Sequence, residues 1–191
     1  MPTSVAAVVL ALVLGVTGCS GGDDDEPDGD GKGDGSSTST GIPSRVEVGE
    51  VAGKLGRKPA RGVARDVAAV VDRWIDAAYV GGDYPRSDFS GAFSGFTGDA
   101  ARLATRQAGL MSNKAVGGKV DGVTATRRVV SVDVLAPQGR PAGATAHVNL
   151  VMEITGDVER TEQVQGRLML VRAKKGWRIF GFDIARGEVR K

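Results

Sequence analysis

The strongest constraint on the fold is a run of four stretches, from about Thr126 to Ile184, in which apolar and polar residues alternate. The stretches are Arg127–Leu135, Ala144–Thr155, Glu162–Arg172 and Trp177–Ile184. A period of two is typical of half-buried strands, because successive side chains point to opposite faces of a sheet. Short turn-forming segments separate the stretches. We therefore expect four strands that pair antiparallel in chain order.

The last stretch supplies the first candidate for a functional side chain. Alternation places Trp177 and Ile179 on one face and Phe180, Phe182 and Ile184 on the other. By the same count, the intervening Asp183 shares the face of Trp177, and burial there would raise its pKa. Because Asp183 lies near the end of the strand, the favoured alternative is that it is a turn or salt-bridge residue.

A sheet with one apolar face needs a cover, and the cover must come from upstream. The segment Gly62–Val80 has apolar residues at steps of three and four and predicts a helix, with Trp74 as its core anchor. Tyr79 follows the same stripe and is expected in the core or at a cavity mouth. On the polar side, Asp72 and Asp76 form a like-charge pair that Arg73 partly offsets.

A second helix is predicted over about Thr97–Met111, with Thr97 as its N-cap. The expected fold class is α+β, with N-terminal helices packed on a curved antiparallel sheet.

Before the first helix, residues 42–61 are expected to form a basic arm or a short strand. Lys54, Arg57, Lys58 and Arg61 of this arm, and Arg65 just after it, follow one another with no acid among them. They indicate either a membrane-surface patch or a solvated basic face. No aromatic residue is interleaved for base stacking, which disfavours nucleic acid.

The N-terminal segment predicts export. Ser4–Val16 is an uncharged apolar run of the length of a signal-peptide core. It ends in Val16-Thr17-Gly18-Cys19, which resembles the bacterial lipobox. The resemblance implies that residues 1–18 are removed and that Cys19 receives a lipid anchor in the membrane. Cys19 is the single cysteine, so no internal disulfide is expected.

The expected tether, residues 19–41, is acidic and almost devoid of apolar residues, which predicts disorder. Residues 20–36 contain seven acids and one lysine, a net charge of −6. Because the whole chain carries +2, the remainder carries +8. A basic body on an acidic tether suits an anionic partner such as lipid headgroups.

The order of elements over residues 62–185, closed by Gly176-Trp177-Arg178-Ile179, resembles the nuclear transport factor two-like superfamily, also called the cone-shaped or SnoaL-like fold. The stretch Ala77–Pro85 also resembles a set of lipoproteins from GC-rich Gram-positive bacteria. The superfamily resemblance implies a domain over 62–186, a short tail at 187–191 and a cavity between helix and sheet. Trp74, Tyr79, Trp177 and Asp183 are its candidate lining residues.

The sequence contains no recognisable catalytic, metal or nucleotide motif. His147, the single histidine, is expected on the polar face of its strand, and Asp133 on the polar face of the strand before it. We expect no cofactor and no metal. The favoured interpretation is a lipid-anchored, non-enzymatic domain that binds a hydrophobic small molecule or an envelope protein, without nucleic acid. The alternative is an isomerase- or cyclase-like enzyme that uses a cavity carboxylate.

Overall fold

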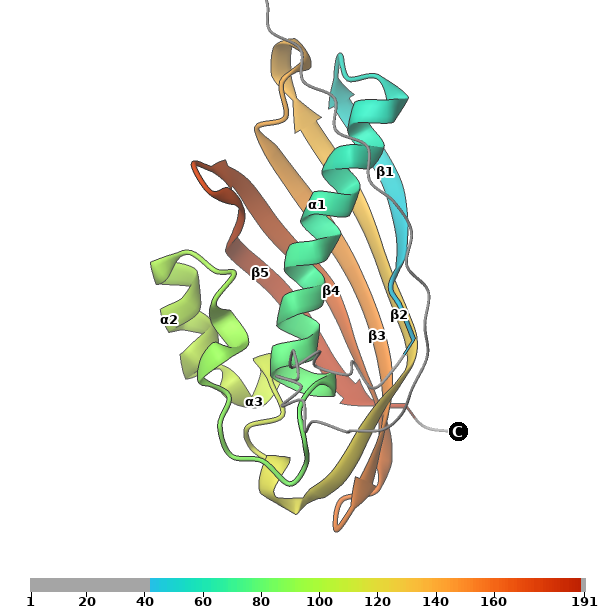
Figure 1. Ribbon diagram of the computed structural model, residues 1–191, viewed down its shortest axis with the longest axis vertical. Coiled ribbons are helices and arrows are strands. Elements are labelled where there is room, and N and C mark those ends of the chain that lie inside the picture. The colour runs from blue at the N-terminus through green and yellow to red at the C-terminus, as the bar shows by residue number, and fades with distance from the viewer. Residues whose placement is uncertain (1–41, 190–191) are drawn as a thin grey trace, which may run out of the picture. The chain divides into compact units, whose positions relative to one another are not determined.

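The computed structural model describes residues 42–189, which belong to one compact unit, Ser36–Lys191 (Figure 1). The expected leader, Cys19 and the acidic tether lie outside the described residues. In chain order the elements are β1 (Arg45–Gly53), α1 (Arg57–Ile75), η1 (Asp76–Val80), η2 (Ser90–Phe93), α2 (Gly98–Arg106), α3 (Ala108–Met111), η3 (Gly117–Lys119), β2 (Val120–Ala136), η4 (Pro137–Gly139), β3 (Gly143–Gly156), β4 (Arg160–Ala173) and β5 (Gly176–Glu188).

The described strands form one sheet with the order β1-β2-β3-β4-β5. The four predicted strands are β2 to β5, and their antiparallel pairing in chain order is confirmed. The sheet as a whole is mixed rather than antiparallel, because β1 pairs with β2 in parallel. The residues expected to form a basic arm are therefore β1 and the beginning of α1. A parallel neighbour requires a crossover, which α1 and the segments after it supply.

Helix α1 lies along one face of the sheet (Figure 1). Its predicted apolar stripe is buried there, including Val67, Val71 and Trp74. The helix begins at Arg57, before the predicted start at Gly62, and its last turn is the π-helical segment η1. The second predicted helix is divided at Gln107 into α2 and α3, although Thr97 does occupy the N-cap position of α2.

Aromatic rings fill the space between α1 and the sheet. Trp74 packs edge to face against Tyr79, with ring centroids 5.4 Å apart, and against Phe96 at 6.4 Å. Phe96 in turn contacts Phe93 and Phe182 in the same manner. Such aromatic pairs contribute about 0.5–1.5 kcal/mol beyond their buried area. The helix-covered face is thus a packed core.

A β-bulge in β5 decides which side chains face that core. Leu170 pairs with Ile179 and Met169 pairs with Gly181, so Phe180 is an extra residue between them. An extra residue reverses the alternation beyond it. As a result Phe182 and Ile184 pack against the core together with Trp177 and Ile179, whereas the sequence alternation placed them on opposite faces.

Candidate functional site

The side chains predicted to line a cavity divide between the core and the opposite face. Trp74, Tyr79 and Trp177 are buried in the core. Trp74 Nε1 donates a hydrogen bond to the Met111 carbonyl at 3.2 Å, and the Tyr79 hydroxyl donates one to the Leu110 carbonyl at 2.7 Å. Burial raises the pKa of Tyr79 far above its ordinary value, which keeps the phenol neutral. These two hydrogen bonds fasten the α3 region to α1 and η1.

Asp183 lies on the other side of the sheet. Its side chain is 68% exposed and accepts a hydrogen bond from Arg167 at 2.7 Å. The bulge at Phe180 explains this position, since it moves Asp183 off the face that the simple alternation assigns to it. Asp183 is therefore a salt-bridge residue, as the alternative interpretation of the sequence held. The sheet separates its carboxylate from the packed core.

Carboxylates on the helix side of the sheet are neutralised by arginine. Arg128, whose side chain is 4% exposed, contacts Asp76 at 2.7 Å and Asp72 at 3.0 Å. Arg128 Nη2 also donates to the Asp72 main-chain carbonyl at 3.2 Å. The like-charge pair on α1 is thus offset by Arg128 of β2, which forms the ion pairs with both acids, whereas the sequence analysis considered only Arg73. This cluster holds the helix on the sheet.

A second buried cluster lies near the C-terminal end of β5. Arg186 forms an ion pair with Glu162, and both side chains are less than one tenth exposed. Arg186 also donates to the Ser112 carbonyl at 2.7 Å and to Asn113 Oδ1 at 2.8 Å. Because a removed partner would leave a buried charge, such a pair fixes geometry strongly. Its role here is to hold the segment after α3 against β4 and β5.

The opposite face of the sheet carries the candidate site. No described helix covers this outer face (Figure 1). Its polar part is a row of paired side chains: Asp133 with His147 at 2.8 Å, Arg167 with Asp183, and Gln163 with Asn149 at 2.9 Å. Its apolar part lies toward the turns after β2 and β4. This face therefore combines an apolar area with an ordered polar border.

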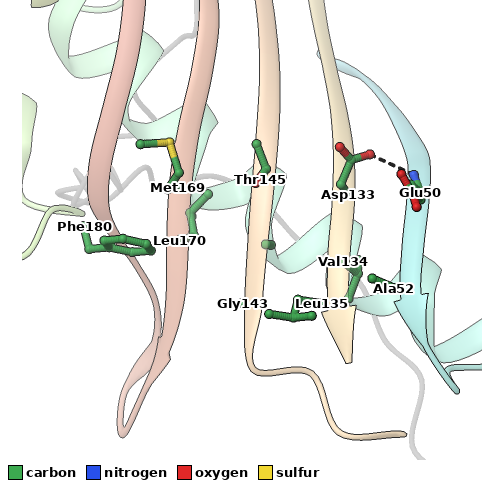
Figure 2. A pocket seen from close by; sticks show the side chains of 11 residues that line it. Glu50, Ala52, Asp133, Val134, Leu135, Gly143, Thr145, Met169, Leu170 and Phe180 are labelled. Atoms are coloured by element: carbon green, nitrogen blue, oxygen red, sulfur yellow. Dashed lines mark hydrogen bonds between the residues drawn. The ribbon is translucent and has the colours of Figure 1, made fainter. Parts of the chain in front are cut away.

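The apolar part contains a pocket of about 290 Å³ (Figure 2). Its lining comes from all five strands: Glu50, Ala52, Asp133, Val134, Leu135, Gly143, Ala144, Thr145, Met169, Leu170 and Phe180. Leu135 and Phe180 are 53% and 54% exposed, high values for large apolar side chains. Figure 2 shows Phe180 and Leu135 on opposite sides of Gly143, over separate strands.

Two glycines and the bulge shape this pocket. Gly143 pairs across the sheet with both Leu135 and Val171, so its missing side chain leaves a hollow between them. A Cβ atom at Gly181 would lie 2.8 Å from Met169 Cε, so this glycine lets the methionine lie across β5. The bulge adds Phe180 to the same surface, in keeping with the use of bulges to redirect side chains.

Asp133 and His147 form the polar border next to the pocket. Asp133 Oδ1 accepts a hydrogen bond from the Glu50 main-chain N–H at 2.8 Å, and Oδ2 lies 2.8 Å from His147 Nε2. Partial burial raises the pKa of Asp133, but the hydrogen bonds from His147 and Glu50 and the charge of His147 lower it more. The net pKa lies below the ordinary value. Asp133 is thus held as a carboxylate, and His147 is oriented by it.

Sequence reasoning missed Arg128, Arg186 and the pocket around Phe180. For Arg128 a signal was present, because it shares the alternation of Val130 and Val132 and so falls on the core face. A charge at a core position of a strand indicates a buried partner. For the bulge that exposes Phe180, the signal is the adjacent Gly181, since an isolated glycine inside a strand can mark a bulge.

Within residues 42–189, no group of three or more histidine, cysteine, aspartate or glutamate side chains is arranged to hold a metal ion. No helix in this part of the chain is long and apolar enough to span a bilayer. Comparisons with protein families, with curated proteins and with solved structures give no match. The functional interpretation therefore depends on the outer face and on the N-terminal sequence.

Proposed function

We propose that the protein is an exported, lipid-anchored domain that binds an envelope protein through the pocket on its outer sheet face and catalyses no reaction. The observation that carries this proposal is the exposure of Phe180 and Leu135 around a hollow at Gly143, on a face that no described helix covers. Exposed apolar surface bordered by polar residues is typical of interaction sites. On the other side of the sheet, Trp74 of α1 packs against Tyr79 and Phe96 in the core.

The shape of the pocket favours a protein partner over a small molecule. Small-molecule sites usually measure about 300–1,000 Å³ and enclose most of the ligand. This pocket is about 290 Å³ and lies on an open sheet face, where a ligand keeps one side in water. An aromatic or aliphatic side chain presented by a partner fits such a hollow, and the surrounding charged pairs form the polar rim found at protein interfaces.

Site-specific photo-crosslinking in the native host tests the binding proposal. A photoreactive amino acid at Phe180 is expected to capture one envelope protein. Gly143→Val fills the hollow without placing a side chain at positive φ, and we expect it to abolish the crosslink. The same probe at Arg127, exposed on β2 of the same sheet, is the control. Equal capture at both positions, or no capture at Phe180, would contradict the proposal.

The anchor has its own test. The lipobox resemblance places the lipid on Cys19, and two or more acyl chains hold a protein firmly on a bilayer where one is marginal. We expect Cys19→Ala to move the mature protein out of the membrane fraction, and mass spectrometry of the wild type to show a modified Cys19 as the first residue. An unchanged membrane fraction would contradict the lipobox assignment.

The finer fold assignment is also a proposal. A long helix on an antiparallel four-strand meander supports a nuclear transport factor two-like arrangement over residues 62–186. The parallel edge strand β1 is an addition to the expected pattern. An experimental structure with a different strand order would remove the assignment, while leaving the pocket proposal intact.

The alternative, an enzyme that uses a cavity carboxylate, is favoured by one observation, the Asp133–His147 pair beside the pocket. General bases work best when their pKa lies near the working pH. The pKa of Asp133 is lowered, which makes this carboxylate a weak base at neutral pH. The helix-side carboxylates Asp72, Asp76 and Glu162 are each paired with arginine. Binding is therefore the better supported of the two functions.

A further inference from the structure

Positive charge gathers at one end of the sheet. The β1–α1 turn contributes Lys54, and the β4–β5 turn contributes Lys174 and Lys175. Arg140 lies between β2 and β3, in a connection whose Gly139 approaches the Lys54 carbonyl so closely that a Cβ there would lie 2.9 Å from it. Because β2 to β5 are antiparallel, the β2–β3 and β4–β5 turns lie at the same end of the sheet.

Helix α1 begins at this end and extends the charge. Arg57, Arg61 and Arg65 follow each other at steps of four, which places them along one side of the helix. Together with Lys58 they are exposed, and no acid occupies the first turn of the helix. The positive pole of the helix dipole lies at the same N-terminal end and has the same sign as these side chains. We refer to Lys54, Arg57, Lys58, Arg61, Arg65, Arg140, Lys174 and Lys175 as the basic end.

The charges of the basic end are not compensated within the described part of the chain. None of them takes part in an ion pair with residues 42–189. The segments 54–65, 134–146 and 170–178, which build this end, contain no acid at all. Like charges at steps of four destabilise a helix. An anionic partner would remove that repulsion.

The far end of the sheet has the opposite character. Asp157 and Glu159 lie in the β3–β4 turn, and Asp121 and Glu188 lie near the beginning of β2 and the end of β5. All four are exposed, and they outnumber the exposed Lys119 at the same end. The domain is therefore electrically polar along its strands, with one basic and one acidic end. Such a body adopts a defined orientation against a negatively charged surface.

We propose that the basic end docks the domain on the anionic lipid headgroups of the membrane to which it is tethered. Each Lys or Arg near an anionic bilayer adds to the attraction, and the attraction falls with salt. Docking in this orientation places the acidic end away from the bilayer and leaves the outer sheet face open. The partner captured by the pocket is then one that lies close to the membrane surface.

Vesicle co-sedimentation of the compact unit, residues 36–191, tests the docking without the anchor. The probes are vesicles of phosphatidylcholine alone and vesicles with about 30% phosphatidylglycerol. We expect binding only to the anionic vesicles, weakened at least about tenfold when NaCl rises from about 50 mM to about 500 mM. Since the fragment lacks Cys19, this result is independent of the lipobox. It is also independent of the photo-crosslink at Phe180.

A pair of charge-matched variants locates the binding surface. Replacing Arg57, Lys58, Arg61 and Arg65 with glutamine keeps good helix formers and is expected to weaken vesicle binding at least about tenfold. The control replaces Arg106, Lys114, Lys119 and Arg127, four exposed bases away from the basic end, with the same loss of charge. We expect the control to bind within about twofold of wild type.

Three results would overturn the docking proposal. One is equal binding to neutral and anionic vesicles, and another is equal weakening in the two variants. The third is binding to a soluble polyanion such as heparin without binding to anionic vesicles. Circular dichroism of each variant verifies folding, and the salt dependence of the wild-type fragment decides the proposal even where a variant unfolds.

Discussion

Gly49 lies so close to the carboxylate of Asp133 that a Cβ atom at Gly49 would be 2.1 Å from Asp133 Oδ1. Gly49 is in the irregular part of β1, where the parallel register with β2 shifts between Val48 and Val51. The absent side chain makes room for Asp133 to accept the Glu50 main-chain N–H. This hydrogen bond joins β1 to β2 at the point where their main-chain pairing is interrupted.

We predict that Gly49→Ala lowers the free energy of unfolding by about 1–3 kcal/mol, because the methyl group displaces a carboxylate that is held by two hydrogen bonds. Urea denaturation of the fragment 36–191 measures the change. Asp133→Ala removes the clash, so the double variant is expected to lose less stability than the sum of the two single variants. Gly62→Ala is the control, since nothing lies within 4 Å of its Cβ position and alanine favours the helix. Additive losses would contradict the proposed contact.

The second prediction is that the lowered pKa of Asp133 makes the stability of the fold depend on pH. Its pKa is lower in the folded state than the ordinary value near 3.9, so its stabilising contribution is fully present above that value. The contribution is lost as the pH falls through the lowered pKa. The side chain is 39% exposed, so solvent screening limits the effect to below about 1 kcal/mol.

The measurement for this second prediction compares wild type with Asp133→Asn between about pH 6 and about pH 2 by urea denaturation. We expect the wild-type advantage to shrink as the pH falls through the acidic range. An advantage that stays constant over the whole range would show that Asp133 does not titrate with a lowered pKa.

Alternation and turn residues were sufficient to predict β2 to β5. Apolar residues at steps of three and four were sufficient to predict the helix that covers them. Local patterns carry this information because each half-buried strand repeats every two residues and each amphipathic helix every 3.6. β1 was harder to predict, since its side chains are largely exposed at the sheet edge and it pairs with a strand more than 70 residues away in parallel. Edge position removes the burial contrast on which a period of two depends.

The candidate site was harder to predict than the fold. Alternation in β5 fails at Phe180, where one extra residue reverses the faces of Asp183 and Phe182. The local sequence signal is Gly181, which follows Phe180 directly, since an isolated glycine inside a strand can mark a bulge. It does not give the register, because a bulge is set by the pairing of two strands. Cross-strand pairs such as Asp133–His147 depend in the same way on register, which a single sequence does not specify.

The third prediction concerns Arg128, which joins β2 to Asp72 and Asp76 of α1. We expect Arg128→Ala to lower the free energy of unfolding by roughly 2–4 kcal/mol, because two neighbouring carboxylates lose their shared counter-charge. The estimate is below the upper range for buried pairs since both acids are partly exposed. Chemical denaturation measures it.

Arg73→Ala is the matched control for Arg128. Arg73 is exposed and lies between the two acids in the sequence. If proximity along the helix were decisive, Arg73 would neutralise Asp72 and Asp76 as much as Arg128 does. We expect a change within about 0.5 kcal/mol. Comparable losses for the two arginines would contradict the assignment of the counter-charge to β2.

The fourth prediction uses the bulge itself. Because Ile179 and Gly181 pair with the consecutive residues Leu170 and Met169, removing Phe180 joins two segments that are already in register. We therefore expect deletion of Phe180 to leave a folded domain that still unfolds cooperatively, while the photo-crosslink from a probe moved to the pocket residue Leu135 is lost. The domain is expected to stay folded because the deletion moves no other side chain of β5 to the opposite face.

Deletion of Asp183, three residues further along β5, provides the contrast. Asp183 lies within regular pairing, opposite Arg167, so its removal reverses the face of one part of the strand. Ile184 and Arg186 would then leave the core side, and the Arg186–Glu162 ion pair would break. We expect this variant to aggregate or to unfold without a cooperative transition. If the Phe180 deletion behaves in the same way, the extra residue is required for folding, and its role as an exposed group of the binding pocket loses its main support.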